Sequence, residues 1–198
     1  MKSVLVSEKP IMCDKIANGK KTIIVKKKAP KEVPFKCYIY CTFPKKPAYT
    51  LWLNRGTENK FLADGKVIGE FICDKIDDFY CASVPYQREN NLGYGRFIDN
   101  GVYKVNGWHE GIVFERNDRY IDTMLNNNVL KEMYLSAQEL FDYIGVGKHL
   151  YAWHISDLKI YDKPRALSEF GKAGFGHEVP LKRPCAPWCY VEDLKEKK

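Results

Sequence analysis

Two spacings of apolar residues recur along the chain, one typical of strands and one typical of helices. Short runs rich in β-branched and aromatic residues, bounded by Gly, Pro or charged residues, predict strands. These runs lie at residues 4–6, 22–25, 37–42, 67–73, 150–155, 158–161 and 188–191. Gly69, inside one of these strands, indicates a bulge or the close approach of another segment to the backbone.

Two stretches with helical spacing carry signals for the start and end of a helix. The first follows Ser7, its expected N-cap, and ends at Gly19. The second opens at Ser136, which can form a capping box with Glu139, and ends at Gly145. We therefore expect two helices beside a set of short strands.

Residues 80–135 follow neither spacing. Asn, Gly and Asp are scattered there among aromatic residues, and only the part around 121–125 suggests a helix. We interpret this stretch as an irregular insertion in a single domain comprising residues 1–198, a length that favours one domain over two. Short strands with few helices predict an α+β protein, specifically a small, mostly antiparallel β-barrel with flanking helices.

The composition is that of an ordinary globular protein. Hydrophobic residues make up 45% of the chain, and no apolar run approaches the roughly 20 residues that a membrane helix requires. Charge interrupts the N-terminal apolar stretch too early for a secretion signal, so we expect a cytoplasmic protein without a membrane partner. In that reducing compartment most of the seven cysteines are expected to be thiols.

Positive charge is concentrated in the first third of the chain. Residues 1–60 contain 14 Lys and Arg against 4 Asp and Glu, a net charge of +10, whereas residues 61–198 have a net charge of −3. Between Lys20 and Lys36 there are seven lysines and one acid, Glu32. A field of this kind attracts polyanions. The simpler alternative is a solvated lysine face that keeps the protein soluble.

Four stretches together resemble one family. They are residues 19–26 after the first helix, 67–74 with a central acid, 150–162 followed by Lys-Pro, and 188–192. In this order they resemble the ASCH domain, a relative of the PUA barrel found in many bacterial and phage proteins. The resemblance covers both ends of the chain and leaves residues 80–135 largely uncovered. It implies a PUA-like barrel with a cleft between barrel and helix that binds RNA or a modified nucleoside.

The family motif is Gly-x-Lys-x-x-Glu-x-Arg, and this chain follows it in part. Gly19 and Lys21 match, whereas Ile24 and Lys26 stand at the Glu and Arg positions. Lys26 keeps the charge of Arg without its planar fork, and Ile24 offers neither a charge nor a hydrogen bond.

The resemblance and the charge together predict a protein that binds RNA or a nucleotide-like ligand in a basic cleft. Glu70 is expected on the cleft wall. The candidate ligand-binding residues are Lys20, Lys21, Lys26, Lys27 and Lys28.

An enzymatic function is the alternative. Some small ASCH proteins are amidohydrolases that act on N4-acetylcytidine with a Lys, a Thr and a Glu. By the resemblance Lys21 and Glu70 take two of these positions, and Ile24 falls where the Thr is required. Thr22 could replace it, because residues two apart in a strand share a face. Two further possibilities are a structural Lys21–Glu70 ion pair and an interaction module in which the 80–135 insertion binds a protein.

Other candidate sites are weaker. Cys185 and Cys189 with His177 lack the second ligand pair of an ordinary zinc site, so we expect no metal and no cofactor. His154, between apolar residues, is typical of a hydrogen-bonded core or cleft histidine rather than a catalytic base. Trp108, flanked by Gly and His, is the tryptophan we consider for base stacking.

Overall fold

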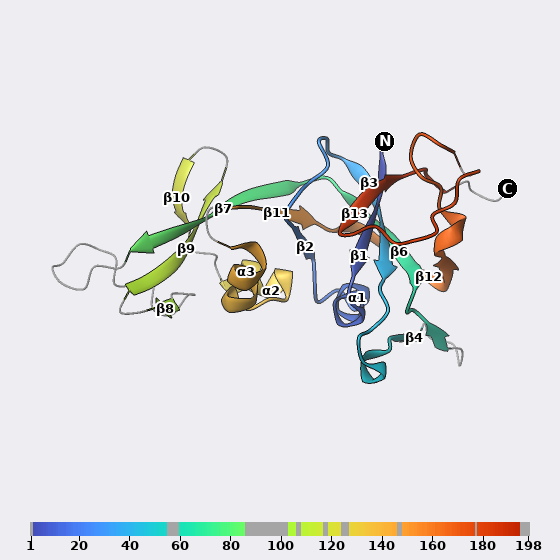
Figure 1. The fold of residues 1–198 in the computed structure, drawn as a ribbon, viewed down its shortest axis with the longest axis horizontal. Coiled ribbons are helices and arrows are strands. Elements are labelled where there is room, and N and C mark those ends of the chain that lie inside the picture. Colours follow the sequence, from blue (N-terminus) through green and yellow to red (C-terminus); the bar gives the residue numbers. More distant parts are fainter. Residues whose placement is uncertain are drawn as a thin grey trace. The chain divides into compact units, whose positions relative to one another are not determined.

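The structure is a computed structural model that describes residues 2–54, 60–85, 103–105, 108–116, 119–123, 127–145, 148–176 and 178–194. The described residues form two compact units. The first unit contains the described parts of residues 1–22, 31–75 and 154–198, and the second those of residues 23–30 and 76–153. Strands in both units are mostly antiparallel and helices are few, which confirms the mixed α and β class (Figure 1).

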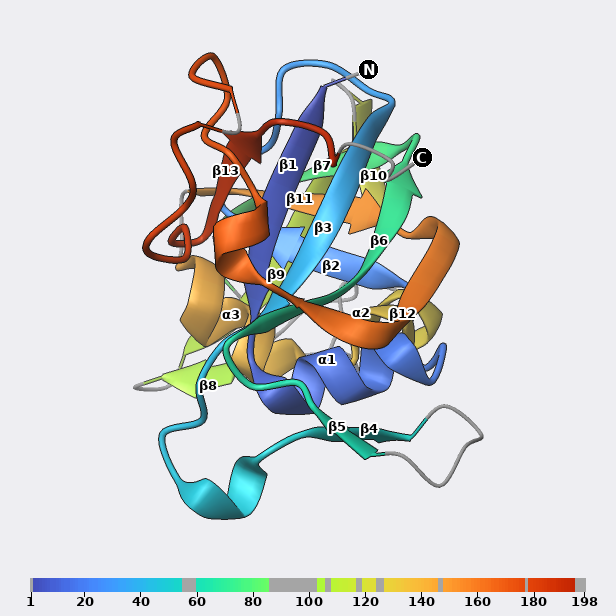
Figure 2. The same ribbon diagram turned by 90° about the vertical axis from the view of Figure 1, so that its right-hand side faces the viewer.

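The first unit is built on a five-stranded sheet (Figure 2). Its strand order is β12-β6-β3-β1-β13, and all neighbours are antiparallel except the parallel pair β1 and β3. The elements of the sheet and the helix α1 that follows β1 are β1 (Ser3–Glu8), α1 (Pro10–Ala17), β3 (Phe35–Cys41), β6 (Lys66–Cys73), β12 (Ser156–Ala166) and β13 (Trp188–Val191). The strand orders of the described residues do not close into a ring, so the barrel stays a prediction.

Side chains from distant parts of the chain make the core of the first unit. Leu5 of β1, Tyr38 of β3 and Val67 of β6 are buried together with Phe170, which follows the short helix η2 (Leu167–Glu169). The rings of Tyr38 and Phe170 meet edge to face with centroids 4.9 Å apart. Burial of such large apolar groups is the main favourable term in folding, so this cluster stabilises the sheet.

Gly69 lies at the close approach that the sequence indicates. A Cβ atom at this position would lie 2.4 Å from the backbone oxygen of Lys159 on the neighbouring strand β12. The register between β3 and β6 also shifts between Ile39 and Tyr40, opposite this part of β6. The close approach and the bulge that the sequence indicates at Gly69 are therefore both confirmed.

A short excursion joins β3 to β6. It contains the 3₁₀ helix η1 (Pro47–Tyr49) and the two-stranded sheet of β4 (Trp52–Asn54) and β5 (Lys60–Leu62) (Figure 2). The sequence does not predict these elements, because runs of three residues are too short to show a period.

The second unit is built on a six-stranded sheet. Five of its strands follow the order β10-β9-β7-β11-β2, and β8 pairs with β9. Its elements are β2 (Ile23–Lys26), β7 (Ile76–Pro85), β8 (Tyr103–Val105), β9 (Trp108–Arg116), β10 (Arg119–Thr123), α2 (Asn127–Met133), α3 (Ala137–Ile144) and β11 (Lys148–His154). Apolar residues of α2 and α3 pack against β2 and β11 (Figure 1).

The described part of residues 80–135 is more regular than expected. It contains strands β8, β9 and β10 and helix α2 in place of an irregular insertion. The helix expected around 121–125 is wrong for residues 121–123, which belong to β10, and residues 124–126 lie outside the described residues. The capping box is confirmed, because the Ser136 backbone N–H donates to Glu139 Oε2 at 2.9 Å and the Glu139 N–H donates to Ser136 Oγ at 3.2 Å.

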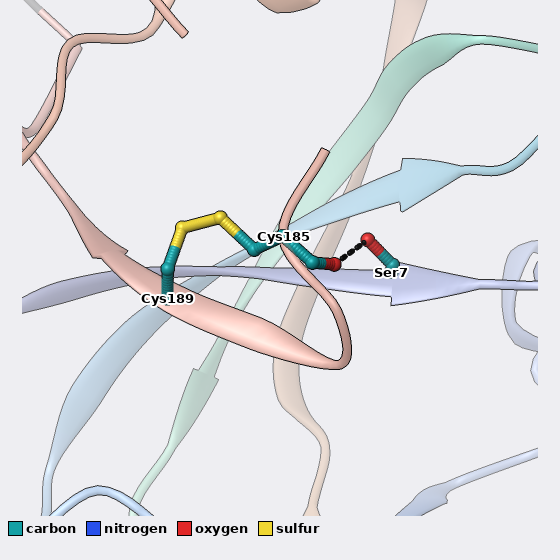
Figure 3. Close-up of a disulfide and its surroundings, with 3 residues drawn as sticks. All are labelled: Ser7, Cys185 and Cys189. Atoms are coloured by element: carbon teal, nitrogen blue, oxygen red, sulfur yellow. Dashed lines mark hydrogen bonds between the residues drawn. A yellow bond between two sulfur atoms is a disulfide. The ribbon is translucent and has the colours of Figure 1, made fainter. Parts of the chain in front are cut away.

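The expected cap at Ser7 is wrong, and one pair of cysteines forms a disulfide. Ser7 does not cap α1 but belongs to β1, and its hydroxyl donates to the carbonyl oxygen of Cys185 at 2.6 Å (Figure 3). Cys185 and Cys189 form a disulfide, whereas the cysteines at 13, 37, 41 and 73 are buried thiols, as expected for most of the cysteines. The disulfide connects the segment that hydrogen-bonds to β1 with β13, the strand paired with β1.

No helix within the described residues has both the length and the apolar composition to cross a membrane.

Candidate nucleic-acid interface

The end of helix α1 positions Lys20 and Lys21. Gly19 has a φ of +67°, a left-handed conformation that glycine adopts without strain, and it turns the chain out of the helix. The backbone N–H groups of Lys20 and Lys21 both donate to the carbonyl oxygen of Lys15, at 2.8 and 3.0 Å. The side chain of Lys20 is exposed, whereas Lys21 is only 3% exposed. Lys20 is therefore accessible to a ligand in solution, whereas the side chain of its neighbour Lys21 is buried.

Strand β2 and the residues after it carry the other candidate lysines. All four residues of β2 are buried, including Lys26, which is 5% exposed. Lys27 and Lys28 follow the strand and are exposed. The ammonium of Lys27 lies 5.0 Å from the ring centroid of Tyr143 in α3, a cation–π contact that restrains the lysine at the surface.

Glu70 is held by a hydroxyl group. Its side chain is half-buried in β6, and Oε2 accepts a hydrogen bond of 2.6 Å from the hydroxyl of Tyr161 in β12. Burial raises the pKa of Tyr161 well above its usual range, and donation to the Glu70 carboxylate raises it further. The guanidinium of Arg165 lies 5.2 Å from the Tyr161 ring centroid. Glu70 is therefore an oriented acceptor in the first unit.

The candidate residues divide between the two units. Lys20, Lys21 and Glu70 belong to the first unit, and Lys26 to Lys28 belong to the second.

Thr22 does not occupy a position equivalent to Ile24. It precedes β2 and is exposed, and its carbonyl oxygen accepts a hydrogen bond of 2.9 Å from the Ile155 N–H. Ile24 is completely buried within the strand. Strand β2 begins at Ile23, so Thr22 is the residue before the strand and Ile24 lies within it.

Sequence reasoning missed a second polar cluster in the first unit. The hydroxyl of Tyr38 in β3 donates to the carboxylate of Asp193, and the ammonium of Lys36 lies 3.3 Å from the same carboxylate. The largest single effect on the pKa of Asp193 is burial, which by itself raises this pKa. The hydrogen bond from Tyr38 and the charge of Lys36 outweigh burial and lower that pKa. Tyr38 and Asp193 are 155 residues apart, so no local pattern could have found this pair.

The structure adds little support for a functional role of the remaining candidate residues. His154 is half-buried and its backbone N–H donates to the Lys75 carbonyl oxygen at 3.1 Å. Trp108 begins β9, and its side chain lies outside the described part. His177 also lies outside the described residues, and those residues contain no group of three or more metal-ligating side chains.

Among the comparisons with known proteins, only the comparison of structures finds similar proteins. No family model matches the sequence, and no curated protein matches it. The crystal structure of ASCH from Zymomonas mobilis is similar, with 16% identity, a TM-score of 0.44, and coverage of 84% of this chain and 74% of that chain. Two mutants of the same protein have 17% identity and TM-scores of 0.44 and 0.46, with coverage of 84% of this chain and 77% and 75% of theirs. These are structures of ASCH domains, the family that the four sequence stretches resemble.

Proposed function

We propose that the protein binds RNA or a nucleotide-like ligand through the lysines of its first 60 residues, as an ASCH-type PUA-like barrel. The observation that carries the proposal is the exposure of basic side chains between Lys20 and Lys36, the most basic stretch of the chain. Lys20, Lys27 and Lys28 are exposed there. The one acid of that stretch, Glu32, has its carboxylate 3.0 Å from the ammonium of Lys2, which lies outside the stretch. The stretch therefore keeps a strong positive field.

In this proposal each lysine has a role that depends on whether it is exposed or buried. Exposed lysines contact phosphates, because an ammonium on a flexible stem neutralises a phosphate without fixed geometry. Lys21 is buried in the first unit, so in this proposal it meets a ligand only where the ligand enters a basic cleft. Lys26 is buried in the second unit and is a separate candidate. Glu70, oriented by Tyr161, would accept a hydrogen bond from a base or sugar on the wall of that cleft.

Fluorescence anisotropy with a labelled RNA of about 12 nucleotides tests the proposal. We expect affinity to fall between about 50 and 200 mM KCl, with a log–log slope of about −0.7 for each phosphate contact to a single strand. The variant Lys20→Gln/Lys27→Gln/Lys28→Gln should make this slope shallower by about 2. The matched control is Lys163→Gln/Lys172→Gln/Lys182→Gln, which removes the same charge from three exposed lysines elsewhere.

Two results would overturn the proposal. The first is absence of binding by the unaltered protein at low salt. The second is an equal loss of affinity in the two triple variants, which would show that net charge alone attracts the RNA.

The alternative function is an amidohydrolase that acts on an acylated nucleoside such as N4-acetylcytidine. Lys21 would be its base or nucleophile and Glu70 would transfer the proton. Lys21 is 3% exposed, and this alternative requires it to act as a desolvated amine. Ile24 weighs against it, since a completely buried aliphatic side chain stands where these enzymes keep a hydroxyl.

A further inference from the structure

The excursion between β3 and β6 exposes an unusual amount of aromatic surface. Phe43, Tyr49 and Trp52 are 72%, 58% and 56% exposed. They are half of the exposed aromatic residues in the described part of the chain, and they lie within ten consecutive residues. Exposed apolar groups that gather in one segment of a protein mark an interaction surface.

The exposure of Trp52 follows from the alternation of β4. Leu51 and Leu53, on either side of it, are 9% and 7% exposed and point inward. Trp52 therefore points outward, and its partner in the register of the hairpin is Leu62 of β5. A tryptophan in this position adds little to folding, since its large apolar surface stays in water.

The excursion is fixed at its base. Buried Asp64 accepts a hydrogen bond of 3.1 Å from the Leu51 N–H. The Ala63 N–H donates to the Leu51 carbonyl oxygen at 2.9 Å, and the Gly65 N–H donates to the Cys41 carbonyl oxygen at 2.8 Å. These hydrogen bonds fix the base of the excursion before any ligand arrives, which lowers the entropic cost of binding there.

The position of the Phe43 ring requires a glycine at residue 65. A Cβ atom at Gly65 would lie 2.3 Å from the Phe43 ring, so this ring packs directly over the glycine backbone. Gly65 has a φ of +72°, which also favours glycine. Phe43 is therefore placed by contact with the base of the excursion while most of its surface stays exposed.

Basic residues are interleaved with these aromatic residues. Lys45, Lys46 and Lys60 are exposed, and residues 43–62 contain one acid and four basic residues. Aromatic faces stack on bases and ammonium groups pair with phosphates, and this combination is typical of proteins that bind single strands. An apolar protein partner would be matched less well, because interface cores are depleted in lysine.

We propose that Phe43, Tyr49 and Trp52, with Lys45, Lys46 and Lys60, form a stacking surface for single-stranded RNA, here called the β4–β5 surface. This inference rests on the proposed RNA binding and assigns a second contact region to it. Bases stack on the three rings without sequence preference, and the lysines neutralise the adjacent phosphates.

The test compares two oligonucleotides that carry the same phosphates. One is an RNA of about 12 uridines, and the other is an abasic strand of equal length. We expect the protein to prefer the RNA, and Trp52→Ala or Tyr49→Ala to lose about tenfold in RNA affinity each. Abasic binding should change little in these variants. The matched control is Phe175→Ala, which removes a ring that is 59% exposed outside the β4–β5 surface.

A spectroscopic measurement guards against misfolded variants. Trp52→Phe keeps an aromatic face, so it should keep most of the affinity while removing the quenching of tryptophan fluorescence that RNA causes in the unaltered protein. RNA affinity that is unchanged in Trp52→Ala and Tyr49→Ala, with the salt dependence intact, would overturn the β4–β5 surface and leave the proposed function standing. Absence of any RNA binding would instead overturn both.

Discussion

The five candidate lysines fall into an exposed group and a buried pair, and we expect the two to respond differently to substitution. Lys20, Lys27 and Lys28 are exposed and can exchange water for phosphate at little cost. Lys21 and Lys26 are almost completely buried. A buried ammonium loses most of its hydration and must be compensated by fixed polar groups. Substitution of the exposed group should therefore change RNA affinity, whereas substitution of the buried pair should also change the stability of the fold.

The hydrogen bond between Tyr161 and Glu70 leads to a prediction about stability. Tyr161→Phe removes the donor and leaves the half-buried Glu70 carboxylate without it, which should cost about 1 kcal/mol of unfolding free energy at pH 7. The exposed Tyr49 offers a control, since Tyr49→Phe removes a hydroxyl that water already solvates. Urea unfolding of the three proteins measures the difference, and equal stability of all three would contradict the prediction.

The same residue should also shape the alkaline limit of stability. The pKa of Tyr161 is raised in the folded protein, so the folded state keeps its proton where the unfolded chain releases it. Its contribution is complete below the ordinary tyrosine pKa near 10 and is lost as the pH rises above that value. Between about pH 9 and 11 the stability of Tyr161→Phe should therefore fall less steeply than that of the unaltered protein.

At the scale of elements, Gly69 lets β6 and β12 approach each other. We expect Gly69→Ala to lose about 1–3 kcal/mol of unfolding free energy, because its methyl group would meet the Lys159 backbone oxygen, which cannot move aside as a side chain can. At Gly19 an added Cβ meets nothing within 4 Å, and only the φ of +67° opposes it. Gly19→Ala should therefore lose about 1 kcal/mol. A loss in Gly69→Ala no larger than in Gly19→Ala, measured by urea unfolding, would contradict the prediction.

The elements that could be predicted are those with a strong local signal. The strand around Gly69, the helix ended by Gly19 and the capping box of Ser136 and Glu139 each depend on neighbouring residues, and each was found. Ser7 is not the cap, since it belongs to β1 and the helix begins only at Pro10. Its hydroxyl donates instead to the carbonyl oxygen of Cys185, a partner 178 residues away that no local pattern indicates. Tyr161 was not recognised as the partner of Glu70 for the same reason, since they lie 91 residues apart on neighbouring strands.

At the scale of the whole molecule, the basic first third does not coincide with one unit. Residues 23–30, which contain Lys26 to Lys28, belong to the second unit, and the rest of the first 60 belongs to the first. The net charge of +10 in residues 1–60 is thus distributed over both units. A polyanion such as RNA is attracted to the exposed lysines of each unit, because its phosphates interact with their ammonium groups.

The last prediction decides whether the molecule binds a nucleoside derivative or also hydrolyses it. We expect no release of acetate from N4-acetylcytidine above the background of a Lys21→Ala variant. Ile24 is completely buried and has no hydroxyl, and Thr22 is exposed outside the strand. A general acid or base contributes about 10²–10⁴-fold to a rate, so a site that lacks one keeps only traces of activity. Acetate release is followed with the unaltered protein and Lys21→Ala side by side, with far-UV circular dichroism on both to show that the variant is folded. Turnover in the unaltered protein that Lys21→Ala abolishes would establish the amidohydrolase in place of the binder, with Thr22 or another group completing its site.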